Sequence, residues 1–556
     1  MARTRQYLVF FFLISLLLSL LARLFYLQVL NFDRFSGIAS GQHNKVLKIE
    51  PRRGTIFDRY MEPLAINLDV PSVYCDSRGV EDKEVTADAL VSVLGVDRDT
   101  VLERLTRDKA FVWLKRKVDV EDARELRDMD LTGIHFITES KRNYPSDNMA
   151  SHVIGFVGID NDGLEGLELK YDALLKGKPG WRHLIRDAKR RTVLYNEAES
   201  IPPQNGFNIV LTLDSVIQYI VEEEIEKMAV RSNASGATAV VMEPYTGKVL
   251  ALANYPGYDL NDFGKASKES VKNAAVSNVF EPGSVFKVIT ASAVLNEGIV
   301  DPEDRFYCEW GEYKVAGRVL HDYHAYGKLT FRDVIAKSSN IGTVKAAQKL
   351  GEAKLYEYIR KFGFGKNTGI DLPGEVCGIS RPPGIWSRSD ITTIPMGQGI
   401  AVTPIQLACA ISAIGNGGYL VTPYVVERVT TWEGRTHREF APVIKGQVLD
   451  SRTCETLKDI LHRVVTEGTG RRADSRLYKM CGKTGTAQMV NPAGGYYENK
   501  YYATFIGFAP KEDPLIAVVV IARDPHPVHF GGSVAGPAFK GIAERSLQYL
   551  KAERRD

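Results

Sequence analysis

The amino-acid sequence predicts an α+β multidomain protein with a single N-terminal transmembrane helix, an extended middle region, and a C-terminal domain built on one antiparallel sheet flanked by helices. Three observations carry this prediction. An uncharged apolar run opens the chain, a mixed region of short strands and helices follows, and strand-like runs then stand at both ends of a helix-rich region. With 556 residues, the chain is too long for one packed core.

Composition narrows the classes of function. Hydrophobic residues make up 44% and charged residues 25% of the chain, as in an ordinary globular protein. The 71 basic and 68 acidic residues leave a net charge of +3 without a long basic run, which argues against nucleic-acid binding. Six cysteines form neither a CxxC pair nor a metal-ligand spacing. We therefore expect no disulfide scaffold, no metal and no other cofactor.

The N-terminal run predicts a membrane anchor. Residues 7–22 carry no charge, and the apolar stretch continues past Arg23 to residue 30. These 24 residues span the roughly 30 Å hydrocarbon core of a bilayer at the helical rise of about 1.5 Å per residue. Near the end of the span, the long Arg23 side chain can reach the interface. Arg3 and Arg5 favour a cytoplasmic N-terminus.

A cleaved signal peptide is the alternative for this segment. The apolar core of a signal peptide is usually shorter than this run. Cleavage after Ala22 would also require a small residue at position 20, which is Leu20. We therefore predict a cytoplasmic tail at 1–6 and a single transmembrane anchor at 7–30. No second run of comparable length follows, which places the rest of the chain outside the cytoplasm.

The remainder divides into two predicted domains, 31–205 and 206–556. Turn and breaker residues are dense in IPPQNG (201–206), which we take as the boundary. In the C-terminal domain, the patterns predict two helices and two hairpins. The helices are expected at 213–230, with Asp214 as N-cap, and at 535–551; the hairpins pair 236–244 with 248–256 and 503–510 with 514–525.

The first motif with chemical meaning is Ser284-Val285-Phe286-Lys287. It follows a Pro-Gly break and opens a segment that is apolar nearly all round, as in a buried helix. Ser284 and Lys287 share a helix face, and a lysine whose pKa is lowered by burial can act as base for a serine nucleophile. A helix N-cap serine followed by a surface lysine explains the same four residues.

The second motif, Ser338-Ser339-Asn340, lies between two helical patterns. A hydroxyl and an amide at such a junction can relay a proton and hold a substrate amide. Taken alone, the motif is equally an ordinary polar helix terminus.

The third motif, Lys483-Thr484-Gly485-Thr486, lies in a predicted strand. A strand edge offers backbone N–H groups to an extended peptide or to an oxyanion, and Gly485 leaves room for close approach. A phosphate-binding loop would need a glycine where Leu477 stands, so the nucleotide-binding interpretation fails. A structural hairpin remains the alternative.

The order of the three motifs is more specific than any one of them. SxxK is followed after 54 residues by SxN, and after a further 145 residues by KTGT. This is the signature of penicillin-recognising serine transpeptidases and β-lactamases. The chain resembles the class B penicillin-binding proteins, in particular the division-type, FtsI-like septal peptidoglycan transpeptidases.

The resemblance covers nearly the whole chain. RGTIFDR (53–59), TGIDLPGE (368–375) and IPMGQGIAVTPIQLA (394–408) look like segments of this family. One departure is Tyr60-Met61, where the family usually has Asn-Gly, which puts the turn geometry there in doubt. The resemblance implies a non-catalytic pedestal or dimerisation-type domain at 31–205 and a transpeptidase domain with a serine β-lactamase-like fold at 206–556.

The resemblance also implies a reaction. Ser284 would attack the penultimate D-Ala carbonyl of a stem pentapeptide and form an acyl-enzyme, which an amine of a second stem peptide would resolve. Lys287 would be the base and Ser338 the proton relay.

Further roles carry over for substrate binding. Asn340 would bind the peptide amide, and Lys483 would add positive charge near the substrate carboxylate. Thr484 and Thr486 would contact that carboxylate, with Gly485 between them, and the amides of Ser284 and Thr486 would form the oxyanion hole. Period-2 alternation places Lys483 and Gly485 on one face of the strand and the threonines on the other, so it does not show the four groups converging.

Partners and place in the cell follow from the same resemblance. We expect β-lactams as inhibitors, a SEDS-family, FtsW-type glycosyltransferase and other divisome membrane proteins as partners, and the bacterial cytoplasmic membrane at the division septum as the location. A β-lactamase is disfavoured because no Glu-x-x-Leu-Asn segment follows the SxN motif. An elongation-type relative and a membrane-anchored divisome scaffold or β-lactam sensor are the remaining alternatives.

Overall fold

The computed structural model describes residues 2–35, 44–186 and 192–553. Its contacts divide the chain into two compact units, each made of two stretches of sequence. The first unit comprises 1–53 and 176–206, and the second comprises 54–175 and 207–556. The limits predicted at residues 30 and 205 stay predictions.

The first unit holds the apolar helix and a small sheet. Helix α1 (Ala2–Phe25) continues into a π-helical turn, η1 (Tyr26–Leu30), and the stretch from Arg3 to Leu30 is long and apolar enough to cross a membrane. Strands β1 (Asn44–Ile49), β6 (Gly180–Arg186) and β7 (Thr192–Ile201) pair antiparallel in the order β1-β6-β7.

The second unit begins with a subdomain that has a core of its own. Long strand β3 (Pro63–Cys75) pairs antiparallel with β4 (Val112–Lys115) and β5 (Ile134–Asn143). Apolar side chains of this sheet and of three helices bury one another. The helices are α3 (Lys83–Leu94), α4 (Arg98–Thr106) and α5 (Val120–Asp128).

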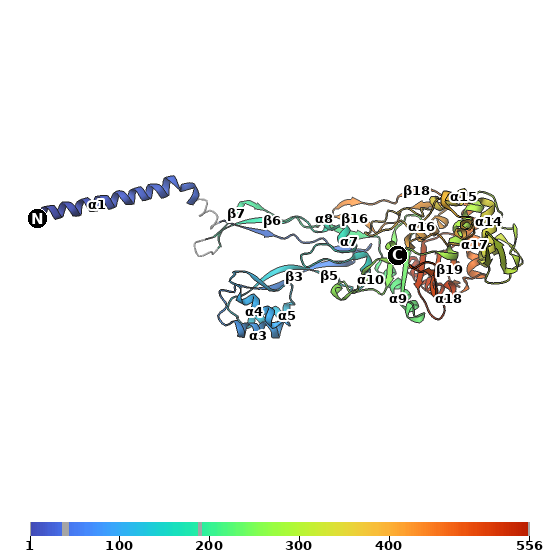
Figure 1. Cartoon of the computed structure of the whole chain (residues 1–556), viewed down its shortest axis with the longest axis horizontal. Coiled ribbons are helices and arrows are strands. Elements are labelled where there is room, and N and C mark those ends of the chain that lie inside the picture. Colours follow the sequence, from blue (N-terminus) through green and yellow to red (C-terminus); the bar gives the residue numbers. More distant parts are fainter. Residues whose placement is uncertain (1, 36–43, 187–191, 554–556) are drawn as a thin grey trace. The chain divides into compact units, whose positions relative to one another are not determined.

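The larger part of this unit is built on one antiparallel sheet, as the sequence predicts, and the sheet has five strands (Figure 1). The strands are β9 (Gly236–Met242), β10 (Val249–Tyr255), β19 (Cys481–Val490), β20 (Tyr496–Ala509) and β21 (Ile516–Arg523). Their order in the sheet is β10-β9-β21-β20-β19. The first of these strands along the chain, β9, therefore pairs with the last, β21, in the middle of the sheet. Strand β19, with the KTGT motif, is at the edge.

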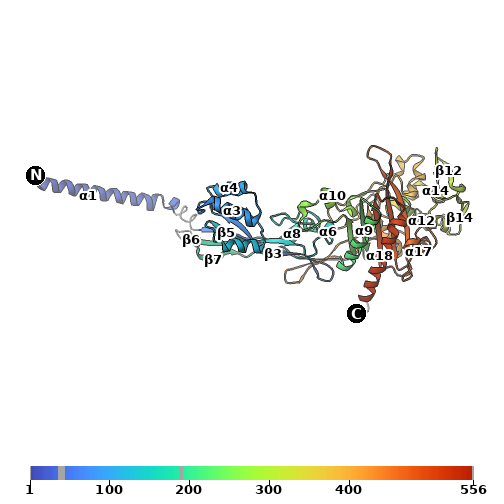
Figure 2. The same cartoon turned by 90° about the horizontal axis from the view of Figure 1, so that it is seen from below.

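Helices cover both faces of this sheet. On one face, α9 (Ser215–Arg231) and α18 (Gly531–Glu553) lie side by side, and their apolar side chains pack on Val518 and Phe505 (Figure 2). On the other face, α16 (Pro404–Gly415) packs on β9, β20 and β21, and α12 (Lys287–Asn296) lies in the same apolar core, where it packs against further helices. Both helices are apolar almost all round because they are buried on nearly every side, α16 between the sheet and other helices and α12 among helices.

The predicted elements of this domain are confirmed with shifts at their ends. Asp214 caps α9 by accepting from the backbone amides of residues 216 and 217, and both hairpins form. The last helix begins at Gly531, four residues before the predicted start. Gly531 and Gly532 are poor helix formers, so sequence periodicity alone misses this first turn.

The turn after RGTIFDR explains the departure at residue 61. Asp58 accepts hydrogen bonds from the backbone amides of Tyr60 (2.8 Å) and Glu62 (2.9 Å), and the chain reverses between them. Met61 has φ = +68°, a left-handed conformation that glycine adopts at lower cost. The turn therefore forms here with a non-glycine residue in a left-handed conformation.

Candidate active site

Ser284 stands at the entrance to a buried helix. It lies in a 3-10 turn, η3 (Gly283–Phe286), which leads directly into α12 at Lys287. Gly283 has φ = +56°, and its amide donates to the carbonyl of Gly397 at 3.1 Å. The SxxK motif is therefore at the start of a helix, as predicted, and its serine stays partly exposed while the lysine is enclosed.

Lys287 is fully buried, and its Nζ donates three hydrogen bonds. The acceptors are the Ser338 carbonyl oxygen (2.6 Å), the Asn340 Oδ1 (2.6 Å) and the Ser338 Oγ (3.2 Å). Burial lowers the pKa of Lys287 from 10.5 to about 7, although the negative charge of Asp322 opposes this shift. The surface-lysine interpretation of the motif is wrong.

Ser338 and Asn340 lie where α13 (Phe331–Ala336) passes into α14 (Asn340–Leu350). Ser338 has φ = +60°, a conformation that costs a non-glycine residue about 1 kcal/mol and is seen where the surroundings fix it. Asn340 Nδ2 donates to the His321 carbonyl at 2.7 Å, which orients its Oδ1 toward Lys287. The SxN motif is therefore fixed by its helix junction, by the His321 carbonyl and by Lys287.

Lys483 approaches the same serine from β19. Its buried Nζ donates to Ser338 Oγ at 2.9 Å and to the Thr484 carbonyl at 3.0 Å. Burial, together with the charge of Lys287, lowers the pKa of Lys483 well below its ordinary value. The Ser338 hydroxyl thus lies between two buried amines.

Glycine at position 485 allows η3 to lie directly on β19. A Cβ added there would come within 2.9 Å of Val285 Cγ1 and 3.0 Å of the Pro282 carbonyl oxygen. The neighbouring threonines face the other way. Thr484 Oγ1 shares a 2.7 Å hydrogen bond with Thr469 Oγ1, and Thr486 Oγ1 accepts from the Gly531 amide at 3.1 Å.

These groups meet at one cavity of about 570 Å³. Ser284, Ser338, Asn340, Thr484 and Thr486 line it. Thr484 and Thr486 of the edge strand β19 line the cavity directly, and Lys483, on the other face of the strand, reaches it through its hydrogen bond to Ser338. The structure thereby brings together residues that strand alternation alone places on opposite faces.

One predicted contact is not formed. In the described part of the chain, no hydrogen bond joins Ser284 Oγ to Lys287 Nζ, whose three hydrogen bonds go to Ser338 and Asn340. Catalytic hydrogen bonds are often long in a protein without its substrate. The role of Lys287 as base of Ser284 stays a prediction.

Asp322 is a site residue that the sequence did not reveal. Its carboxylate accepts from the Ser339 hydroxyl (2.6 Å) and from the backbone amides of Asn340 (2.5 Å) and Ile341 (3.1 Å). It therefore binds the positive N-terminal end of α14 and fixes the SxN turn. A single aspartate after a short strand carries no sequence signal of this role.

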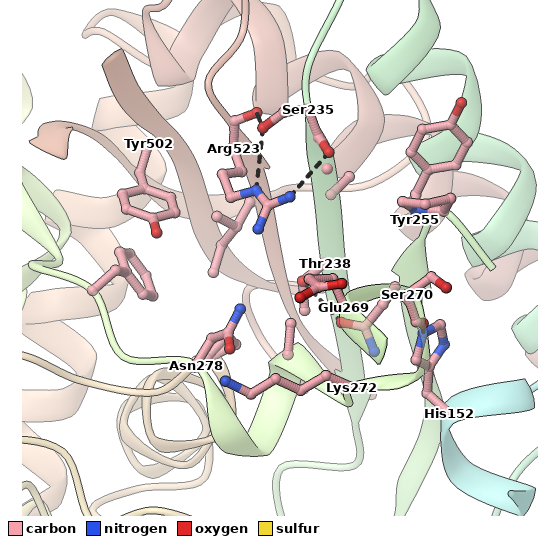
Figure 3. A pocket seen from close by; sticks show the side chains of 18 of the residues that line it. His152, Ser235, Thr238, Tyr255, Glu269, Ser270, Lys272, Asn278, Tyr502 and Arg523 are labelled. Atoms are coloured by element: carbon pink, nitrogen blue, oxygen red, sulfur yellow. Dashed lines mark hydrogen bonds between the residues drawn. The ribbon is translucent and has the colours of Figure 1, made fainter. Parts of the chain in front are cut away.

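A second cavity, of about 180 Å³, lies beside β9, β10 and β21 (Figure 3). Arg523 donates to the Ser235 hydroxyl at 3.1 Å. The His152 ring donates through Nε2 to the Ser270 carbonyl at 2.7 Å. Burial lowers the pKa of His152 to about 4. Neither contact activates a hydroxyl, so the first cavity is the candidate active site.

Among the described residues, no cluster of acidic, histidine or cysteine side chains has the form of a metal site.

Comparison with known proteins assigns the family. The model of the penicillin binding protein transpeptidase domain matches residues 237–544, which is more than half of the chain. The chain belongs to the penicillin-binding protein family. The model of the penicillin-binding protein dimerisation domain matches residues 48–211 of the same chain, so this penicillin-binding protein has the two-domain architecture of the class B type.

Two relatives and one solved structure support the predicted division-type resemblance. Stage V sporulation protein D of Bacillus subtilis is 36% identical over 562 residues, covering 100% of this chain and 87% of the relative. Peptidoglycan D,D-transpeptidase FtsI of Escherichia coli is 31% identical over 543 residues, covering 96% and 90%. Penicillin-binding protein 3 of Mycobacterium tuberculosis, crystallised with aztreonam, superposes with a TM-score of 0.72 at 29% identity, over 91% of this chain and 97% of that one.

Proposed function

We propose that this protein is a peptidoglycan D,D-transpeptidase that cross-links stem peptides through a Ser284 acyl-enzyme during septal cell-wall synthesis and is inhibited by β-lactams. One observation carries the proposal. The Ser338 hydroxyl accepts from Lys483 Nζ and lies 3.2 Å from Lys287 Nζ, in the cavity onto which Ser284 opens. This arrangement supplies a nucleophile, a base and a proton relay in one place.

In the acylation step, Ser284 Oγ attacks the carbonyl carbon of the penultimate D-Ala of a donor peptide. Neutral Lys287 takes the hydroxyl proton as the new C–O bond forms. The C–N bond to the terminal D-Ala then breaks, and its nitrogen receives a proton through the Ser338 hydroxyl. The products are a Ser284 ester and free D-Ala.

Substrate binding uses the edge of β19. The donor peptide lies along this strand, with its terminal carboxylate at Thr484, Thr486 and the positive charge of Lys483. Asn340 holds a peptide amide, and the amides of Ser284 and Thr486 stabilise the oxyanion. The close packing of η3 on Gly485 supports this arrangement because it places the Ser284 turn beside the strand.

The two buried lysines couple substrate binding to catalysis. Each charge disfavours the other, so the pair prefers one added proton to two. A bound substrate carboxylate attracts that proton to Lys483, and Lys287 is then neutral. The anionic substrate thereby prepares the base that acts on Ser284.

In the second step, an amine of an acceptor stem peptide attacks the ester carbonyl. The new amide forms, the Ser284 ester bond breaks, and the proton lost by the amine returns to Ser284 Oγ through Lys287. No charge or atom is left over, so the enzyme begins the next cycle in its original state.

The apolar helix supports a location. The segment from Arg3 to Leu30 anchors the protein as a single-pass protein in the bacterial cytoplasmic membrane, with its N-terminus inside and its catalytic domain outside. We place it at the division septum, with a SEDS-family, FtsW-type glycosyltransferase and other divisome membrane proteins as partners.

Time-resolved labelling of the full-length, detergent-solubilised protein with a fluorescent penicillin tests the proposal. A covalent adduct that lasts many minutes and is absent from Ser284→Ala is expected. Labelling that clears within seconds would identify a β-lactamase, and folded protein without labelling would favour the scaffold. Labelling that persists in Ser284→Ala would remove Ser284 as the nucleophile.

A further inference from the structure

We infer that Lys337 and Arg471 form a carboxylate-binding subsite for the acceptor peptide, beside the groups that hold the donor. This inference rests on the proposed function and specifies its acceptor. It assigns a chemical class: the acceptor is a stem peptide that keeps a free carboxylate within reach of its attacking amine.

The charges that line the active-site cavity give the first argument. The cavity lining includes two basic residues, Lys337 and Arg471, and one acidic residue, Glu467. Glu467 is already paired, since its Oε2 lies 2.9 Å from Arg463 Nε. Among the described residues, neither Lys337 nor Arg471 has an acidic partner, so this part of the cavity has an excess of positive charge.

The second argument is that the two cations come from adjoining segments. The Thr469 amide donates to the Ala336 carbonyl at 3.3 Å, which joins the loop after α17 (Ser451–Thr466) to the end of α13. Lys337 directly follows Ala336, and Arg471 is two residues after Thr469. The two cations therefore come from adjacent segments that line one cavity.

Contacts of the two side chains show how they are held. Arg471 Nη2 donates to the Glu467 carbonyl at 3.0 Å, and the Lys337 ammonium lies 5.6 Å from the centre of the Tyr326 ring. Both contacts leave hydrogen-bond donors for a ligand, because a guanidinium has five and an ammonium three. Guanidinium and ammonium groups together favour a carboxylate.

The position of these cations points to the acceptor. Thr469 shares its hydroxyl hydrogen bond with Thr484, so the segment that carries Arg471 adjoins β19 where we place the carboxylate of the donor peptide. The acceptor amine must occupy the position that the departing amine has left, because both bond to the same carbonyl carbon in line with the same proton relay. The acceptor chain therefore leaves the reaction centre past Lys337 and Arg471.

Partitioning of the acyl-enzyme tests this inference. The full-length protein is acylated by a D-alanyl thioester donor, and the ratio of amide product to hydrolysed product is measured against acceptor concentration. Two acceptors are compared, the same stem peptide with a C-terminal carboxylate and with a C-terminal carboxamide. We expect the carboxylate form to reach half-saturation at a lower concentration.

Substitutions then locate the effect. Arg471→Ala and Lys337→Ala are each expected to raise the half-saturating concentration of the carboxylate acceptor about fivefold, as for a partly exposed charge pair. Arg471→Lys should restore most of the loss. Arg472→Ala is the matched control, since Arg472 lines a different cavity and should change nothing.

Two outcomes would overturn the inference. One is equal half-saturation for the carboxylate and carboxamide acceptors in the unsubstituted protein. The other is an unchanged value in both Arg471→Ala and Lys337→Ala. Penicillin labelling of Ser284 separates these results from failure of the proposed function, because labelling requires only acylation. Absence of labelling overturns the proposed function, and this inference with it.

Discussion

Lys483 Nζ donates a 2.9 Å hydrogen bond to the Ser338 hydroxyl, although 145 positions separate the two residues in the sequence. Lys287 Nζ lies 3.2 Å from the same oxygen. Both amines are buried, so water screens their mutual repulsion only weakly. We propose that this hydroxyl, between two amines of lowered pKa, relays protons, and this role can be tested by pH and by substitution.

Replacing Lys287 by alanine is expected to slow acylation of Ser284 by penicillin by roughly 10²–10⁴-fold, the usual contribution of a positioned general base. The measurement is the second-order rate of adduct formation in stopped flow, with circular dichroism to verify the fold. Lys345→Ala is the control, because Lys345 pairs with Glu309 and lies outside the cavity lining. A rate near that of the unsubstituted protein would exclude Lys287 as the base.

Acylation is expected to depend on pH with an acid limb near pH 7. The base acts only when neutral, and burial lowers the pKa of Lys287 to about 7, so the rate should fall about tenfold per unit below that pH and level off above it. A rate that stays flat from about pH 5.5 to 8 would contradict a lysine base.

The sequence predicts the chemistry of this site better than its geometry. Ser284, Lys287 and Lys483 follow from motifs whose order is specific, and strand runs at both ends of the domain predict the antiparallel sheet. The convergence of Lys483 with Thr484 does not follow, because alternation places them on opposite faces. It depends on β19 being the edge strand, and strand order is set by long-range packing that no local pattern encodes.

Asp322 is a second example of a site residue whose role the sequence does not predict. It holds the SxN turn through the Ser339 hydroxyl and two backbone amides, yet it lies 17 residues before Ser339 in an irregular segment. Helical capping is predictable when the cap is adjacent in sequence, as at Asp214. A cap supplied from a distant loop is visible only in the folded chain.

Asp322→Asn is expected to act on both stability and pH dependence. Loss of the carboxylate weakens the contacts to the amides of Asn340 and Ile341, which should lower the free energy of unfolding by about 1–2 kcal/mol. Because the charge of Asp322 raises the pKa of Lys287, its removal should also move the acid limb of acylation to lower pH.

Thermal unfolding and the pH dependence of acylation measure these two effects separately. Asp301→Asn is the control, since Asp301 is exposed and lies outside the cavity lining. Destabilisation without any shift of the acid limb would show that Asp322 acts on the SxN turn alone and does not influence the charge of Lys287.

Met61→Gly is expected to stabilise the protein. At φ = +68°, methionine pays about 1–2 kcal/mol that glycine avoids, and the greater freedom of glycine in the unfolded chain offsets about 0.5–1 kcal/mol of that gain. The net increase in the free energy of unfolding should be about 0.5–1 kcal/mol, measured by thermal or urea unfolding. Met129→Gly is the matched control, because Met129 is similarly exposed but has φ = −75°. Glycine relieves no backbone strain there and only increases the conformational entropy that folding must remove. It should therefore be destabilised, and equal changes at both positions would show that backbone strain at Met61 is not what distinguishes this turn.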